Sequence, residues 1–91
     1  YVKESSSRLD ALLKQISENA IRKKVEKAYD LIHSSQVKSS YNVKSIEQDV
    51  ISEIDNLEKA IQKNKLDDIQ LIVDKICYLA NERNRQLKLL N

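Results

Sequence analysis

The stretch VKSIEQDVISEIDNLEKAIQK, residues 43–63, decides the fold class of this chain. Its apolar residues recur every three or four positions, which gathers them in one stripe about 80° wide on a helix. The members of this stripe are Val43, Ile46, Val50, Ile54, Leu57 and Ile61. The opposite side is acidic and carries Asp49, Glu53, Asp55 and Glu58. The pattern predicts an amphipathic helix of about 20 residues, ~30 Å long, with one buried side.

A second long helix is predicted over residues 66–90. Its main apolar stripe consists of Leu66, Ile69, Val73, Ile76, Ala80 and Leu87. Leu71, Tyr78 and Leu89 lie on another side of the helix, which leaves two interpretations open. Either the helix is wedged between neighbours of its own bundle, or these three residues form an exposed seam for another chain. Asn64 either begins this helix or, in a left-handed conformation, ends the preceding one.

The segment over residues 5–34 has two apolar faces, turned by about 120° from one another. Leu9, Leu13, Ile16 and Ala20 share the first face, and Ile21, Val25, Ala28 and Ile32 share the second. A break near Ser17–Asn19 competes with a continuous helix. The pair Glu18–Arg22 is acid before base at a spacing of four, bridges the suspected break and favours continuity. We expect one helix with a kink.

The predicted fold is therefore an all-α antiparallel three-helix bundle, with helices over residues 5–34, 43–63 and 66–90, the first of them either kinked or split near Ser17–Asn19. The serine-rich stretch 34–42 is its only long linker. The connection around 63–65 is short, so the last two helices should be antiparallel neighbours. With 91 residues the chain forms one domain, 1–91. Because it begins with Tyr1 and contains no Met, we interpret it as a piece of a longer protein.

Composition excludes several kinds of site. A chain without Gly cannot build a glycine-rich phosphate loop. One Cys and one His cannot supply a four-ligand zinc site. No apolar run is long enough to span a bilayer. We therefore expect no cofactor, no metal and no transmembrane segment within this chain.

Nothing in the pattern indicates an enzyme. Cys77 lies beside the apolar stripe of the last helix, and we interpret it as a small core or boundary hydrophobe. His33, near the end of the first helix, is interpreted as an exposed or half-exposed side chain favoured by the negative helix C-terminus. Because a single Cys forms no disulfide within the chain, we expect a reducing compartment, the cytoplasm.

The formal net charge is +2, but it is unevenly distributed. Residues 1–45 hold nine basic and five acidic side chains, whereas residues 46–91 hold seven basic and nine acidic ones. The candidate contacts for an acidic partner or a nucleic acid are Arg22, Lys23, Lys24, Lys27, Arg83 and Arg85. We also expect the acidic side of residues 45–58 to lie against the cluster at 22–27.

The favoured function is a non-enzymatic protein–protein interaction module that acts in scaffolding or regulation. Its partner is another protein or a second copy, bound in a coiled-coil-like contact through Leu71, Tyr78 and Leu89 of the last helix. The alternative is a nucleic-acid-binding helical bundle that uses the basic cluster at residues 22–27.

Overall fold

The computed structural model describes residues 1–90 and is helical throughout, without strands in that range. It contains four α-helices: α1 (Val2–Leu13), α2 (Asn19–His33), α3 (Lys44–Gln62) and α4 (Leu66–Leu89). A single 3-10 turn, η1 (Tyr41–Val43), precedes α3. The all-α class is confirmed, and the predicted number of three helices is wrong because the first predicted helix is two helices.

The chain breaks between α1 and α2, close to the predicted position at Ser17–Asn19. Glu18 is the N-cap of α2, and its carboxylate accepts hydrogen bonds from the backbone N–H groups of Ala20 and Ile21, each at 3.0 Å. Arg22 instead pairs with Glu26 at 3.3 Å. The spacing of Glu18 and Arg22 thus reflects a cap and not a continuous helix, so the expectation of one kinked helix was wrong.

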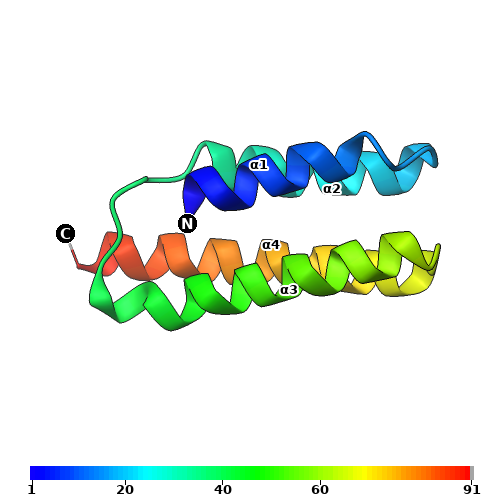
Figure 1. Ribbon diagram of the computed structural model, residues 1–91. Helices are drawn as coiled ribbons and strands as arrows, with labels where there is room; N and C mark the ends of the chain where they lie inside the picture. The colour runs from blue at the N-terminus through cyan, green and yellow to red at the C-terminus, as the bar shows by residue number, and fades with distance from the viewer. Residues whose placement is uncertain (91) are drawn as a thin grey trace.

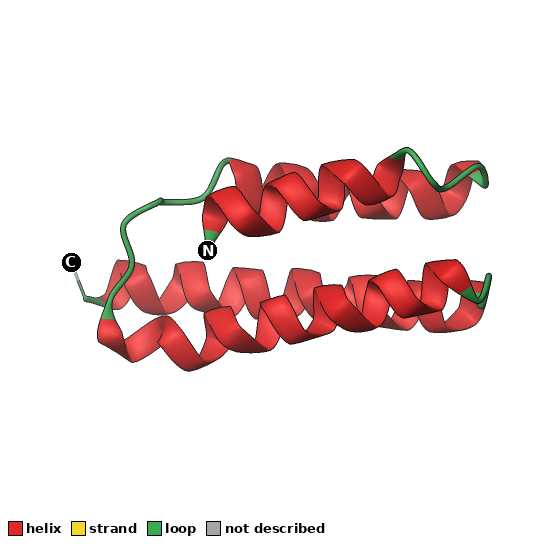
Figure 2. Cartoon of the chain, viewed as in Figure 1, coloured by secondary structure: helices red, strands yellow, loops and turns green. Residues whose placement is uncertain are grey.

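The four helices form two antiparallel hairpins, α1–α2 and α3–α4, which lie against each other (Figure 1). Helix α1 packs on α3 and α2 packs on α4, so α2 and α3 are diagonal to each other. Residues 34–40 cross from one hairpin to the other at one end of the molecule (Figure 2). We call this segment the crossover. The bundle measures 40 × 19 × 18 Å.

The core runs along the axis between the two hairpins. Each helix contributes side chains that are fully shielded from solvent, among them Leu9, Val25, Ile54 and Ile76. Truncating one such residue to alanine typically costs about 2–5 kcal/mol. The break between α1 and α2 lets both apolar faces of the first segment reach this common core.

The turn between α3 and α4 is short, as predicted, and the two helices are antiparallel neighbours. Asn64 has a positive φ of 55°, which is the left-handed conformation that ends many helices. The N–H of Asn64 donates to the carbonyl of Ile61 at 3.0 Å, and the N–H of Lys65 donates to that of Ala60 at 3.1 Å. This Schellman pattern shows that Asn64 ends α3. Asn occupies this left-handed position because the chain has no Gly for it.

Candidate functional site

The outer side of α4 carries a row of largely exposed residues. Helix α4 buries the opposite side, at Ile69, Val73, Ile76, Ala80, Arg83 and Leu87. The outer row, which we call the α4 outer stripe, consists of the half-buried Glu82 and the exposed Leu71, Lys75, Tyr78, Arg85 and Leu89. Its members follow one another at steps of four and three, so they share one side of the helix. The three predicted partner-binding residues therefore lie on one surface.

The apolar members of the α4 outer stripe are far more exposed than is usual for large apolar side chains. Leu71 is 69% exposed, Tyr78 68% and Leu89 72%. The interpretation of α4 as a helix wedged on all sides within its own bundle is therefore wrong for these residues. The three side chains are instead exposed along one side of α4, and their contact with another chain stays a prediction.

Charged residues alternate with the apolar ones along the stripe. Nε of Arg85 donates to the Glu82 carboxylate at 3.0 Å, and the hydrogen bonds from Arg85 and Gln86 lower the pKa of Glu82 to about 2. Nζ of Lys75 lies 3.4 Å from the carboxylate of Glu53 on α3. The stripe thus presents Leu, Lys, Tyr, Glu, Arg and Leu in order, with a negative charge between two positive ones.

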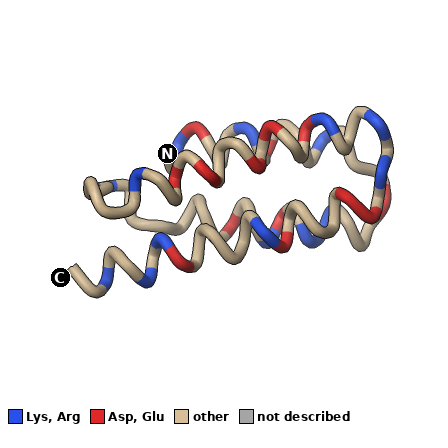
Figure 3. Tube along the Cα trace, turned by 90° about the horizontal axis from the view of Figure 1, so that it is seen from below, with Lys and Arg blue, Asp and Glu red and all other residues tan. Residues whose placement is uncertain are grey.

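The predicted basic cluster on α2 is partly neutralised within the fold. Arg22 pairs with Glu26, and Lys24 lies 3.3 Å from the carboxylate of Asp74 on α4. Lys23 and Lys27 are exposed and take part in no ion pair with any residue in the range 1–90. Basic and acidic residues are interspersed along much of the Cα trace (Figure 3).

The acidic side of α3 does not lie against the basic cluster of α2, contrary to expectation. Helices α2 and α3 are diagonal to each other, so α1 supplies the cation instead. Arg8 of α1 donates from Nη2 to Glu58 at 2.7 Å and also pairs with Asp55. The sequence correctly predicts that the acidic side of α3 pairs with basic residues of another helix. The order of the helices around the bundle decides which ion pairs form.

Arg83 is the largest fully buried side chain in the described range. Its Nε donates to the carboxylate of Glu47 at 2.7 Å, and its Nη2 donates to the backbone carbonyl of Gln36 at 2.8 Å. Its guanidinium carbon lies 4.5 Å from the centroid of the Tyr1 ring. Arg83 is therefore buried and does not belong to the predicted contact surface. Arg85 is exposed and remains a candidate contact.

The ion pair between Arg83 and Glu47 was not predicted from the sequence, although part of its signal was present. The apolar stripe of α4 skips from Ala80 to Leu87, and helical spacing puts Arg83 in that gap. The stripe of α3 has no such gap, because Ile46 lies between Val43 and Val50 and Glu47 is next to it. The spacing therefore indicates that Arg83 is buried, but it does not identify Glu47 as the partner.

The crossover is held to α3 and α4 by polar contacts around this pair. The Asn84 side-chain amide donates to Ser35 Oγ at 2.9 Å. The Ser39 hydroxyl donates to Glu47 at 2.8 Å. Together with the bond from Arg83 to Gln36, these contacts fix the crossover at three places.

The two residues considered for nucleophilic chemistry lie in different surroundings. Cys77 is half-buried against the core and borders a surface pocket of about 450 Å³ with Lys24 and Lys27, and burial raises the pKa of its thiol. The His33 ring stacks on Tyr29 with centroids 5.1 Å apart. No hydrogen bond in the described range joins either residue to a nucleophile–base arrangement of the kind that covalent catalysis requires.

Within residues 1–90, no three His, Cys, Asp or Glu side chains come together in a way that could hold a metal ion. None of the helices in that range combines the length and the apolar character needed to cross a membrane. Comparison of the chain with protein-family models, with curated proteins and with solved structures found no match.

Proposed function

We propose that this chain is a non-enzymatic helical interaction module that self-associates through the α4 outer stripe. The observation that carries the proposal is the exposure of Leu71, Tyr78 and Leu89 on one side of a single helix. An exposed leucine alone is unremarkable, but aligned large apolar side chains are typical of contact surfaces. Tyrosine is also enriched at protein interfaces because it combines a large apolar ring with a polar hydroxyl.

The charges of the stripe favour a second copy as the occupant. In a parallel pair of α4 helices, Lys75 would face Lys75 and Glu82 would face Glu82, which is repulsive. In an antiparallel pair with the two-fold axis between Tyr78 and Leu79, each Lys75 faces the Glu82 of the other copy. The two Tyr78 rings then lie side by side at the axis. In this register the charges of Lys75 and Glu82 and the central Tyr78 complement themselves about a two-fold axis, as a closed dimer requires.

The contact we propose is a weak one. One face of one helix buries less than the roughly 1,200–2,000 Å² of a standard stable interface. The ion pairs of Lys75 with Glu53 and of Glu82 with Arg85 also compete with those across the dimer. We therefore expect a dimer whose population depends on protein concentration, as suits a module inside a larger assembly.

Sedimentation equilibrium over a hundredfold range of protein concentration tests the proposal. The wild-type mass should rise with concentration, and Leu71→Lys combined with Tyr78→Lys should give a folded monomer. The matched control is Val37→Lys with Tyr41→Lys, because these crossover and η1 residues are 77% and 88% exposed and lie outside α4. The control should associate like the wild type. A single mass for all three proteins at every concentration would remove the proposal.

A second candidate function, nucleic-acid binding, is favoured by one observation. Lys23 and Lys27 are exposed on α2 without an ion pair in the described range, and Arg22 lies beside them. Phosphate contacts by such residues predict binding that weakens steeply with salt. Absence of any mobility shift with mixed oligonucleotides at low salt would exclude this candidate.

The cellular setting we propose is a reducing one, the cytoplasm. Cys77 is the only cysteine of the chain and is free. An unpaired, half-buried thiol persists most readily where thiols are kept reduced.

A further inference from the structure

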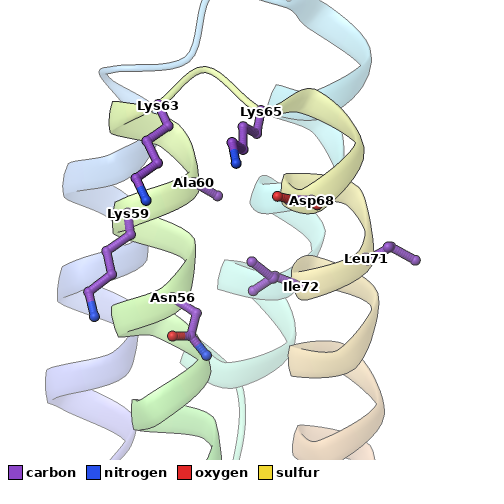
Figure 4. A pocket seen from close by; sticks show the side chains of 8 residues that line it. All are labelled: Asn56, Lys59, Ala60, Lys63, Lys65, Asp68, Leu71 and Ile72. Atoms are coloured by element: carbon purple, nitrogen blue, oxygen red, sulfur yellow. The ribbon is translucent and has the colours of Figure 1, made fainter.

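A groove lies on the surface where the end of α3 meets the start of α4, and it is separate from the crossover and from the buried ion pair. It has a volume of about 300 Å³. Its lining residues are Asn56, Lys59, Ala60, Lys63, Lys65, Asp68, Leu71 and Ile72 (Figure 4). We call it the lysine groove. It involves none of the residues predicted for nucleic-acid contact.

Three ammonium groups surround the lysine groove, and one carboxylate opposes them. Lys59 and Lys63 extend from the last turns of α3, and Lys65 extends from the turn (Figure 4). Lys24 and Lys75 elsewhere on the bundle have carboxylate partners, but these three form no ion pair with any residue from 1 to 90. Basic residues also mark this turn in the trace of the whole chain (Figure 3). The groove is therefore an electropositive surface that the fold itself does not neutralise.

The floor of the groove is apolar, whereas its rim is charged. Ala60 is 6% exposed and Ile72 is half-buried, and both side chains point between the two helices (Figure 4). Asn56 closes one end and supplies an amide that can donate and accept hydrogen bonds. A ligand that fits must combine negative charge with at least one apolar side chain.

We propose that the lysine groove binds an acidic peptide segment of a partner protein, one that carries a leucine-sized side chain among its carboxylates. The carboxylates would face Lys59, Lys63 and Lys65, and the apolar side chain would rest on Ala60 and Ile72. A nucleic acid fits less well, because the groove offers neither an arginine nor an aromatic ring on which a base could stack.

Fluorescence anisotropy with a labelled peptide of repeated Glu-Glu-Leu units tests this proposal. A Gln-Gln-Leu peptide removes the charge, and a Glu-Glu-Ser peptide removes the apolar side chain. We expect the wild-type chain to bind the first peptide and to bind both others more weakly. The groove shares Leu71 with the α4 outer stripe, so the measurement uses Tyr78→Lys as well as the wild type, and its outcome in that variant does not depend on self-association through α4.

The decisive comparison is between two triple variants with the same change in net charge. In the groove variant, Lys59, Lys63 and Lys65 are each replaced by Gln; in the control variant, the exposed Lys14, Lys23 and Lys38 are replaced by Gln. We expect the groove variant to lose affinity about tenfold, since each exposed pair contributes modestly. The control should stay close to the wild type.

Three results would overturn the proposal. An equal loss in both triple variants would mean that overall charge and not the groove attracts the peptide. Equal binding of the Gln-Gln-Leu peptide would remove the role of the lysines. Binding of a mixed oligonucleotide that the groove variant abolishes, without binding of any peptide, would assign the groove to nucleic acid instead.

Discussion

Arg83 and Glu47 form a buried ion pair that joins α4 to α3 at the end of the bundle where the crossover passes. Nε of Arg83 donates to the Glu47 carboxylate at 2.7 Å, and the arginine is completely shielded from solvent. Nη2 of the same guanidinium donates to the Gln36 carbonyl in the crossover. The pair thereby couples the packing of α3 and α4 to the path of the segment that links the two hairpins.

The first prediction concerns the removal of one partner of this pair. Arg83→Met leaves Glu47 buried without a cation, and Glu47→Leu leaves Arg83 buried without an anion. Each single variant is expected to lower the free energy of unfolding by about 3–5 kcal/mol, measured by urea denaturation. The double variant should lose less than the sum of the two. Strictly additive losses would show that the two charges do not depend on each other.

The second prediction concerns the Tyr1 hydroxyl. Its oxygen is buried without a hydrogen-bond partner in the described range, while the ring stacks on Arg83. Tyr1→Phe keeps the ring and removes the unpaired group, so the free energy of unfolding should rise by up to about 1 kcal/mol. Tyr1→Ala should lower it, because the ring that covers the guanidinium is lost. Similar losses in both variants would contradict this assignment.

The free energy of unfolding should depend on pH through the same residue, Tyr1. Burial raises the pKa of Tyr1 from 10.0 to about 12. The unfolded chain therefore releases this proton first, and the contribution of Tyr1 to stability is complete below pH 10 and is lost as the pH rises to 12. Urea midpoints of the wild type should fall more steeply than those of Tyr1→Phe across this interval. Parallel pH profiles would contradict the raised pKa.

Two substitutions at residue 64 should show whether its backbone conformation or its side-chain contacts stabilise the turn between α3 and α4. Asn64→Ala places a Cβ-bearing residue without a compensating polar group at a φ of 55°, and we expect a loss of about 1 kcal/mol in the free energy of unfolding. Asn64→Gly is expected to stay within about 0.5 kcal/mol of the wild type, because Gly adopts this conformation without steric cost. Thermal denaturation compares the two. Equal losses of unfolding free energy in the two variants would show that the Asn64 side chain, and not its backbone conformation, stabilises the turn.

The thiol of Cys77 should react slowly in the folded chain. It is half-buried, and burial raises its pKa, so little thiolate forms at neutral pH. We expect a disulfide reagent to modify it about tenfold more slowly in buffer than in denaturant. Cys77→Ser with Tyr41→Cys, which carries a single exposed cysteine, is the control and should react at one rate in both conditions. Fast reaction of native Cys77 would identify a reactive site that the structure does not account for.

The sequence predicts the parts of this fold that rest on periodicity. The spacing in residues 43–63 and 66–90 locates α3 and α4 to within a few residues, and the short turn predicts their antiparallel packing. The same spacing places Leu71, Tyr78 and Leu89 on a separate side of α4. Each of these inferences needs only the geometry of one helix or one turn.

The features that the sequence did not predict depend on which helices become neighbours. Glu18 serves as an N-cap and not as the partner of Arg22, and both roles suit the same spacing. Arg8 and not the cluster on α2 meets the acids of α3, because α2 lies diagonally opposite. The burial of Arg83 beside Glu47 requires both helices to be in register. The local sequence pattern specifies the helices, and tertiary packing determines which of their charged side chains pair.

Cysteine cross-linking across the proposed two-fold axis tests the central claim, self-association through α4, most directly. In a Cys77→Ser background, Tyr78→Cys places one thiol beside the axis, whereas Leu71→Cys places the two thiols roughly 22 Å apart along antiparallel helices. Mild oxidation should convert Tyr78→Cys to a covalent dimer much faster than Leu71→Cys or Tyr41→Cys. Equal rates for residues 71 and 78 would indicate a parallel pair. A rate for Tyr78→Cys no greater than that of Tyr41→Cys would contradict assembly through α4.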